Sequence, residues 1–419
     1  MSIVDVLSPF TAWKNVFRDP VTIADPLNDR PGSARYRGFH QNDMETCIGC
    51  GTCETICQNA AIDMVPVADI ECKPGDSGLR PQIDYGRCCW CALCVDVCMT
   101  GSLTMSNEYI WVDSDPDAFR FIPGVDKKHW DDSELGYRRP GDKLTSGIRV
   151  EMPELAPEER IDSFVEIVQG YDVQAAVLEA DRCVSCGLCV ATCPTHMAIP
   201  DYIAAIRDGD YEQGLKLLYD SNPFSRVCGR VCTHLCETTC AARHEGEPIA
   251  IRWLKRHITE QIPPERYRDI IGDPAPATGH RVAIIGAGPG GLTAAYDLAM
   301  KGHAVTVYEA EPKAGGMTRY GIPDYRLPGD ILDQDIAVIT SLGVNIIYQT
   351  RVGRDISLQQ LHEDFDAVLI AIGLKSGRST RIPGSDHPEV LKSVDLLNRI
   401  SANVGFDIPQ TAVVIGGGN

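Results

Sequence analysis

Hydrophobic and polar positions divide this chain into segments with different periodicities. Near the N-terminus, apolar residues recur at spacings of three and four, which predicts one amphipathic helix interrupted near Pro9: Val6, Leu7, Phe10, Trp13, Val16 and Phe17. Such a helix packs on its own domain or docks to a partner or a membrane surface. Residues 156–260 have a helical pattern, with helices expected over 158–169, 172–183 and 199–220. From Arg281 the pattern changes to strand, glycine turn, helix and strand.

Two further segments have little periodicity. Residues 106–155 are rich in Pro, Gly, Asp and aromatic residues, which predicts a long covering loop or a linker. Residues 261–279 contain PPER and GDPAPATG and read as a second linker. The chain ends in TAVVIGGGN, which predicts a buried strand entering a glycine turn at Gly416, Gly417 and Gly418.

Composition narrows the function classes. The formal net charge is −19, which argues against a general nucleic-acid binder. The chain contains 18 cysteines, but they are bunched, the N-terminus has no signal-peptide layout, and a chain of 419 residues needs no disulfide framework. The sequence contains no run of 18 apolar residues, so it predicts no membrane-spanning helix. We therefore expect reduced thiols in the cytoplasm, with contact at the inner face of the membrane left open.

The cysteines occur in three copies of the spacing C-x2-C-x2-C-x3-C, followed by a fourth set at x3-x3-x3. The three copies are Cys47, Cys50, Cys53 and Cys57, then Cys88, Cys91, Cys94 and Cys98, then Cys183, Cys186, Cys189 and Cys193. The fourth set is Cys228, Cys232, Cys236 and Cys240. This spacing is typical of proteins that bind [4Fe–4S] clusters, because three thiolates from one tight loop reach three irons.

The first two runs repeat at an offset of 41 residues, from Cys47 to Cys88, and so form a duplicated half-domain. The fourth cysteine of each run is expected to begin a helix aimed elsewhere and to serve the other cluster. This predicts one site at Cys47, Cys50, Cys53 and Cys98, and a second at Cys88, Cys91, Cys94 and Cys57. A zinc site, which favours two pairs of ligands, and reactive thiols are the alternatives. Cys72 and Cys89 fall outside the pattern and are read as ordinary thiols.

Roughly residues 10–110 resemble the ferredoxin-like subunit of respiratory complex I. The likeness rests on NVFRDPVTIADP and RYRGFH, followed by ETCIGCGTCETIC and GRCCWCALCVDVC. That family usually has proline after each fourth cysteine, where this chain has Gln58 and Met99. In complex I the subunit docks beside membrane subunits, so the resemblance favours a docking role for residues 1–45.

The third and fourth cysteine sets resemble the cluster domain of the glutamate synthase small subunit, shared by dihydropyrimidine dehydrogenase and the bifurcating transhydrogenase. The likeness rests on RCVSCGLCVATCPTHMAIPDYI and NPFSRVCGRVCTHLCETTC. It implies one cluster on Cys183, Cys186, Cys189 and Cys240, and another on Cys193, Cys232 and Cys236. Several relatives complete the latter with Gln or Glu, whose counterpart here is Lys255. Because a protonated lysine cannot ligate iron, Cys228 becomes the candidate for that place.

The segment RVAIIGAGPGGLTAAYDLAMKGHAVTVYEA has the pattern of a dinucleotide-binding turn between a strand and a helix. Its candidate residues are Gly286, Gly288, Pro289, Gly290, Gly291 and, for the ribose, Glu309. The next residues, EAEPKAGGMTRYGIPDYRLP and FDAVLIAIGLKSGR, resemble the flavin domain of the glutamate synthase small subunit. The resemblance implies FAD, and it adds Gly315, Gly316, Met317, Arg326, Ala371 and Gly373 to the cofactor-binding residues. Ile372 replaces the family's usual Thr.

The expected fold is an α+β ferredoxin-like domain, an α-helical iron–sulfur domain and an α/β Rossmann-like FAD domain. Residues 1–45 are expected to form a docking segment, 46–105 the ferredoxin-like domain, and 106–155 the loop or linker. Residues 156–262 are expected to form the helical iron–sulfur domain, 280–408 the FAD domain, and 409–419 the first strand of a truncated NAD(P)H domain. Since the rest of that domain is absent, we expect a fragment of a longer protein.

The expected function is an oxidoreductase that passes electrons between NAD(P)H, FAD, four [4Fe–4S] clusters and a redox partner protein, in a hetero-oligomer. The alternatives are a non-catalytic electron-transfer subunit and the electron-input subunit of glutamate synthase.

Overall fold

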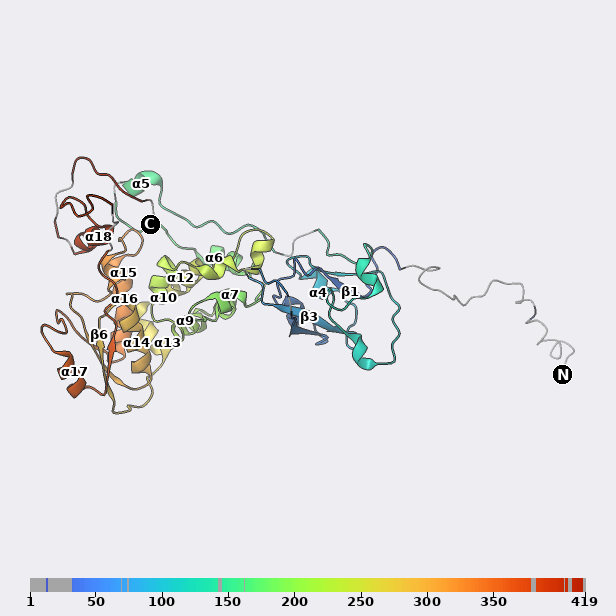
Figure 1. The fold of residues 1–419 in the computed structure, drawn as a ribbon, viewed down its shortest axis with the longest axis horizontal. Coiled ribbons are helices and arrows are strands. Elements are labelled where there is room, and N and C mark those ends of the chain that lie inside the picture. Colours follow the sequence, from blue (N-terminus) through green and yellow to red (C-terminus); the bar gives the residue numbers. More distant parts are fainter. Residues whose placement is uncertain are drawn as a thin grey trace. The chain divides into compact units, whose positions relative to one another are not determined.

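A computed structural model describes Trp13 and residues 32–416, apart from 69, 74, 142–144, 162, 378–381, 403 and 406–408. The chain divides into two compact units, Met1–Leu144 and Thr145–Asn419, which are treated separately below (Figure 1). The predicted N-terminal helix lies outside the described residues except for Trp13, which is exposed. Gly417 and Gly418 also lie outside them.

The first unit is built from two small antiparallel sheets and short helices. One sheet pairs β1 (His40–Asn42) with β4 (Leu103–Met105). The other has the order β2 (Ile62–Pro66), β3 (Leu79–Asp84) and β5 (Arg120–Phe121). The helical elements are α3 (Thr52–Ile56), α4 (Leu93–Asp96), η2 (Pro116–Phe119) and η3 (His129–Asp132).

One predicted boundary of this unit is wrong. β1 falls inside the expected docking segment 1–45, yet its pairing with β4 makes it part of the ferredoxin-like fold. Of the two alternatives for residues 106–155, a covering loop or a linker, the described part up to residue 141 fits the covering loop, because Phe121 and Trp130 are each 1% exposed in the core of the unit. The ring of Trp130 stacks on Phe39 with centroids 4.4 Å apart. Large aromatic side chains, rather than periodic positions, therefore fold this stretch onto the sheets.

The second unit begins with a helical part. Its elements are α5 (Pro157–Ile161), α6 (Val173–Ala180), α7 (Leu188–Thr192), α8 (Ile199–Asp208), α9 (Tyr211–Tyr219), α10 (Ser225–Val231), α11 (Leu235–Thr238), η4 (Ala241–His244), α12 (Ile251–Gln261), η5 (Pro264–Arg266) and α13 (Tyr267–Ile271).

Two predictions for this helical part need correction. The helix expected over 158–169 ends at Ile161, because the backbone of Ile167 and Gln169 instead bonds to Leu155 and Pro153. The expected linker 261–279 contains η5 and α13, since the buried Tyr267 anchors it and donates its hydroxyl to the carbonyl of Thr259.

The rest of the second unit is a parallel sheet with the order β8 (Asn345–Ile347), β7 (Ala304–Tyr308), β6 (Arg281–Ile285) and β9 (Ala367–Ile370). The helices are α14 (Pro289–Met300), α15 (Met317–Tyr320), α16 (Gly329–Ser341), α17 (Leu358–Asp364) and α18 (Ser393–Ser401). Residues of α14 and α16 share one core cluster with the strands, and Leu361 of α17 packs in another with Ala283. This alternation of parallel strands and helices is the expected Rossmann-like arrangement.

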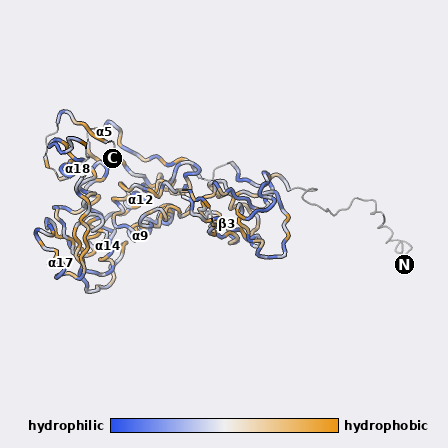
Figure 2. Tube along the Cα trace, in the orientation of Figure 1, coloured by the Kyte–Doolittle hydropathy of each residue, from blue (hydrophilic) through white to orange (hydrophobic). Residues whose placement is uncertain are grey.

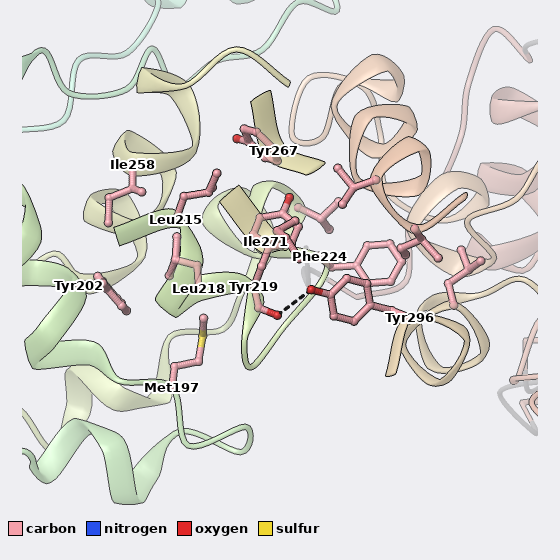
Figure 3. Packing of buried hydrophobic residues seen from close by; sticks show 14 of the residues in the cluster. Met197, Tyr202, Leu215, Leu218, Tyr219, Phe224, Ile258, Tyr267, Ile271 and Tyr296 are labelled. Carbon is pink, nitrogen blue, oxygen red and sulfur yellow. Dashed lines mark hydrogen bonds between the residues drawn. The ribbon is translucent and has the colours of Figure 1, made fainter. Parts of the chain in front are cut away.

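One hydrophobic core runs from the helical part into the sheet part of the second unit (Figure 3). Tyr219, Phe224 and Tyr267 of the helical part pack in it with Tyr296 of α14. The Tyr296 hydroxyl donates a hydrogen bond of 3.2 Å to the carbonyl oxygen of Tyr219. The helical part and the sheet part are therefore one packed body.

The strand predicted within 409–419 is not formed in the described part of that segment. Residues 412–416 have no strand hydrogen bonds, and Val413 and Val414 are more than 80% exposed. An extended segment needs a paired neighbour to form a ladder, and no described strand lies beside this one.

Hydrophobic and hydrophilic stretches are intermixed along the chain (Figure 2). No helix among the described residues is long and apolar enough to cross a membrane.

Candidate cluster and flavin sites

The three repeated cysteine runs share one backbone conformation. In each run the residue before the second cysteine and the residue after it are left-handed, with φ between 51° and 76°: Gly49 and Gly51, Trp90 and Ala92, Ser185 and Gly187. Only glycine adopts this region freely, so Trp90, Ala92 and Ser185 are held there at a cost. Backbone strain of this kind gathers at binding sites, where the fold requires a particular loop shape.

A short helix follows each loop and ends one or two residues before the fourth cysteine. Cys57 caps α3, Cys193 caps α7, and Cys98 follows Val97, which caps α4. The expectation that the fourth cysteine begins a helix is therefore wrong. The helix instead carries the fourth sulfur away from its own loop, which still allows it to serve another site.

The first site gathers cysteines from both runs of the first unit. Burial raises the pKa of Cys50, whose Sγ lies 3.3 Å from the hydroxyl of Thr52, and the thiols of Cys98 and Cys47 raise that pKa further. Burial also raises the pKa of Cys53, which is close to a wider group of thiols: Cys50, Cys47, Cys94 and Cys98. The structure thus brings Cys98 from the second run to the first loop.

The second site has the complementary composition. A cavity of about 80 Å³ is lined by the four predicted cysteines of this site, Cys57, Cys88, Cys91 and Cys94. Cys89 and His40 also line it. Burial raises the pKa of Cys94 to about 12, and nearby Cys88, Cys91 and Cys57 contribute to the increase. The backbone N–H of Ala61 points at Cys57 Sγ at 3.3 Å. Cys72, in contrast, is exposed and lines no part of this cavity.

The third site lies in the helical part of the second unit. A small cavity of about 20 Å³ is lined by Cys183, Cys186, Cys189 and Cys240. Burial raises the pKa of Cys189, and the first neighbours to raise it further are Cys186, Cys183 and Cys240. The four residues are the predicted set.

The fourth site brings together Cys193, Cys232 and Cys236. Burial raises the pKa of Cys236 to about 12; Cys232 and Cys193 raise it further, whereas the ammonium group of Lys255 lowers it. Cys228 is also close, because both Cys232 and Lys255 affect its pKa, and its Sγ accepts a hydrogen bond of 3.2 Å from Asn222 Nδ2. Lys255 is itself buried. Cys228 remains the predicted fourth ligand.

Within the described part of the chain, no three His, Cys, Asp or Glu side chains converge closely enough for one metal ion. The cysteines of the second and third sites surround cavities instead. Thiolates spaced around a cavity suit a cofactor with several metal atoms.

The predicted flavin site is built from close backbone contacts between glycines. A Cβ on Gly291 would lie 2.0 Å from the carbonyl oxygen of Gly286, and one on Gly316 would lie 2.7 Å from Gly288 Cα. Gly315 N–H donates to the Ala287 carbonyl at 2.8 Å. Gly288 and Pro289 open α14, whose N-terminus has no side-chain cap. Free N–H groups at a helix N-terminus suit a pyrophosphate.

The other predicted flavin residues surround this turn or follow it. Glu309 is buried at the end of β7, and its carboxylate accepts from the N–H groups of Ala287 (2.7 Å) and Glu311 (2.8 Å). Each oxygen can still accept a further hydrogen bond. Ala371 lies beside Gly286, and Met317 begins α15. Gly290 and Gly373 have no neighbouring atom where a Cβ would be.

Arg326 lies near a residue that the sequence did not single out. Burial lowers the pKa of Arg252, and the charge of Arg326 is among the groups that lower it further. Arg252 Nη1 also donates to the carbonyl of Cys232 at 3.2 Å. Arg252 thus lies beside the fourth cysteine site, and Arg326 is close enough to affect its pKa. Nothing in the spacing of the sequence marks Arg252.

Comparison with known proteins supports the same organisation. Residues 40–63 match a 4Fe-4S binding domain, and residues 160–266 match dihydropyrimidine dehydrogenase domain II, 4Fe-4S cluster. Residues 280–419 match the pyridine nucleotide-disulphide oxidoreductase family. These matches support the expected resemblance to iron–sulfur flavoproteins of the glutamate synthase small-subunit type.

Curated proteins similar to this chain include two that are named as beta subunits. The chain is 40% identical to the NADPH-Fe(3+) oxidoreductase subunit beta of Geobacter sulfurreducens, over 55% of this chain and 35% of that protein. It is 42% identical to the NADP(+)-dependent formate dehydrogenase subunit beta of Moorella thermoacetica, over 55% of this chain and 36% of that protein. It is 29% identical to the oxidoreductase UacF of Escherichia coli, over 90% of this chain and 60% of that protein. The chain thus spans roughly a third of the first two relatives.

Proposed function

We propose that this protein is an electron-transfer subunit that links NAD(P)H and FAD to four [4Fe–4S] clusters. The observation that carries the proposal is that the Cys98 thiol is close to Cys50 and that Cys57 lines the cavity of the second site, as an exchange of fourth cysteines requires. A zinc module or a set of reactive thiols has no need of such an exchange, whereas two-cluster ferredoxins use it.

The chain's own residues would bind and shield these groups. The four cysteine sets would supply the thiolates, and the left-handed residues give the loop of each repeated run the same backbone shape. The turn from Gly286 to Gly291 and the free end of α14 would receive the FAD pyrophosphate, with Glu309 next to the ribose. When bound, the clusters carry single electrons and FAD exchanges electron pairs with nicotinamide.

We further propose that the protein works with a partner subunit. Two of its relatives are named as beta subunits, one of an NADPH-Fe(3+) oxidoreductase and one of a formate dehydrogenase. A chain that passes electrons through clusters requires a donor or acceptor at the far end of the relay. A role for residues 1–45 in docking stays a prediction.

An anaerobic reduction experiment tests this function. NADH or NADPH, added to the purified full-length protein, should bleach the visible absorbance of the flavin, and the cluster absorbance should then decrease. Dithionite provides the control, because it reduces clusters without a nicotinamide site. If dithionite reduces the clusters but neither nucleotide bleaches the flavin, the proposed nicotinamide-linked function is wrong and a non-catalytic relay is favoured.

A further inference from the structure

A buried histidine contacts one of the predicted cluster ligands. His40 is the first residue of β1, it is 1% exposed, and it lines the cavity of the second site. Its Nε2 atom lies 3.3 Å from the Sγ atom of Cys94, which is 54 residues further along the chain. A contact of this length between a ring nitrogen and a sulfur is a hydrogen bond.

The direction of this hydrogen bond follows from the rest of the ring. Nδ1 of His40 is buried and has no hydrogen-bond partner among the described residues. A neutral imidazole has one N–H group, and the nitrogen with an acceptor in reach is Nε2. A thiolate can only accept, so Nε2 donates and Cys94 Sγ accepts. A protonated ring would donate in the same way, because it also has a proton on Nε2.

The backbone around His40 fixes the ring in this position. The N–H of His40 donates to the Tyr85 hydroxyl at 2.9 Å, and His40 is paired with Met105 across the two strands. The preceding residue, Phe39, is stacked on Trp130. A donor held by a strand and by packed aromatic rings keeps its geometry, which a loop residue would not do as well.

We propose that His40 is a positioning residue that donates a hydrogen bond to Cys94 and raises the reduction potential of the cluster at the second site. The inference rests on the proposed cluster at Cys57, Cys88, Cys91 and Cys94. Reduction adds negative charge to a cluster and its thiolates, and a hydrogen bond to a thiolate stabilises that charge. The first site instead has hydroxyl groups beside its sulfurs, from Thr52 near Cys50 and Ser102 near Cys98.

Pulsed electron paramagnetic resonance tests the contact directly. The full-length protein is grown with histidine carrying ¹⁵N in the imidazole ring and is then reduced with dithionite. We expect a ring-nitrogen coupling in the signal of one cluster, and His40→Phe should remove it. His129→Phe is the matched control, because the His129 ring is exposed and contacts Glu108. The absence of any ring-nitrogen coupling in the reduced wild-type protein would overturn the proposal.

A redox titration of the same variants tests the effect. His40→Phe should lower the midpoint potential of one cluster and leave the others unchanged, whereas His40→Gln, which keeps an N–H donor, should restore part of the shift. Unchanged potentials in His40→Phe at full iron content contradict the inference. If His40→Phe loses iron, the wild-type coupling and the potential of His40→Gln decide. A wild-type protein without a cluster at the second site refutes the proposed function instead, and iron analysis shows the difference.

Discussion

The left-handed residues in the cysteine loops show how strongly the fold constrains these sites. Trp90 and Ser185 occupy the same position as Gly49, although a side chain in this region costs roughly 1–2 kcal/mol. The residue three places after each fourth cysteine is also left-handed: Ala60, Gly101 and His196. A conformation that recurs with different side chains is required by the path of the chain and does not follow from local preference.

Substituting the fourth cysteine of one run by serine should remove the cluster that is held mainly by the other run. Cys98→Ser should abolish the same reduced-cluster signal as Cys50→Ser, because both are predicted to serve the first site. Cys57→Ser should abolish the signal that Cys91→Ser abolishes. Each variant should lose about four irons per chain. Cys72→Ser is the control, since Cys72 is exposed. If Cys98→Ser instead matched Cys91→Ser, the runs would not be interleaved.

A single methyl group should disrupt the flavin site. In Gly291→Ala the new Cβ would lie 2.0 Å from the Gly286 carbonyl oxygen, so the turn could not keep its shape. We expect loss of bound FAD, measured by absorbance after gel filtration. Gly329→Ala is the control on α16, where the nearest atom to a Cβ is 3.8 Å away. Equal FAD content in both variants would contradict this placement of the cofactor.

At the scale of elements, α16 is tied to the helical part by one buried carboxylate. The Asp335 side chain accepts from the Tyr219 hydroxyl of α9 at 2.6 Å and from the Val227 N–H of α10 at 3.1 Å. Burial raises the pKa of Asp335 to about 7, against the lowering effects of these two hydrogen bonds and of the charges of Arg226 and Arg230.

This carboxylate should make the stability of the second unit depend on pH. The folded state binds the proton more tightly than the unfolded state, whose aspartate has a pKa of about 3.9. The free energy of unfolding should therefore fall as pH rises from about 4 to 7, by at most about 1.4 kcal/mol per pH unit from this group. Asp335→Asn should flatten the dependence, measured by chemical denaturation under anaerobic conditions. An unchanged slope would show that Asp335 does not titrate in this range.

Helices and strands can be predicted where apolar residues recur periodically in the sequence. They are missed where contacts between distant residues determine the local structure. The strands and glycine turn from Arg281 onward and the helix over Val173–Ala180 follow from their patterns. The helix expected over 158–169 stops early, because backbone pairing of Ile167 with Leu155 competes with it. Likewise α13 forms in an expected linker, because Tyr267 finds a buried partner in Thr259 that lies outside any local pattern.

At the scale of the whole molecule, the sequence predicts which cysteines gather at each candidate site better than it predicts where the domains begin and end. The grouping of Cys183, Cys186 and Cys189 with Cys240 is implied by the family resemblance, and the structure gathers the same residues. The boundary at residue 144 is not readable, since Phe121 and Trp130 complete the first core from a stretch without periodicity. His40 was missed because only the fold brings it to Cys94.

The number of clusters tests the account most directly. Anaerobically reconstituted protein should contain about sixteen irons and as many acid-labile sulfides per chain, four of each in four cubane clusters. The measurement counts iron and sulfide against protein concentration from amino-acid analysis, in the full-length chain. Cys72→Ser should give the wild-type value. A plateau near eight irons per chain would contradict the account, because two of the four cysteine sites would then hold no cluster.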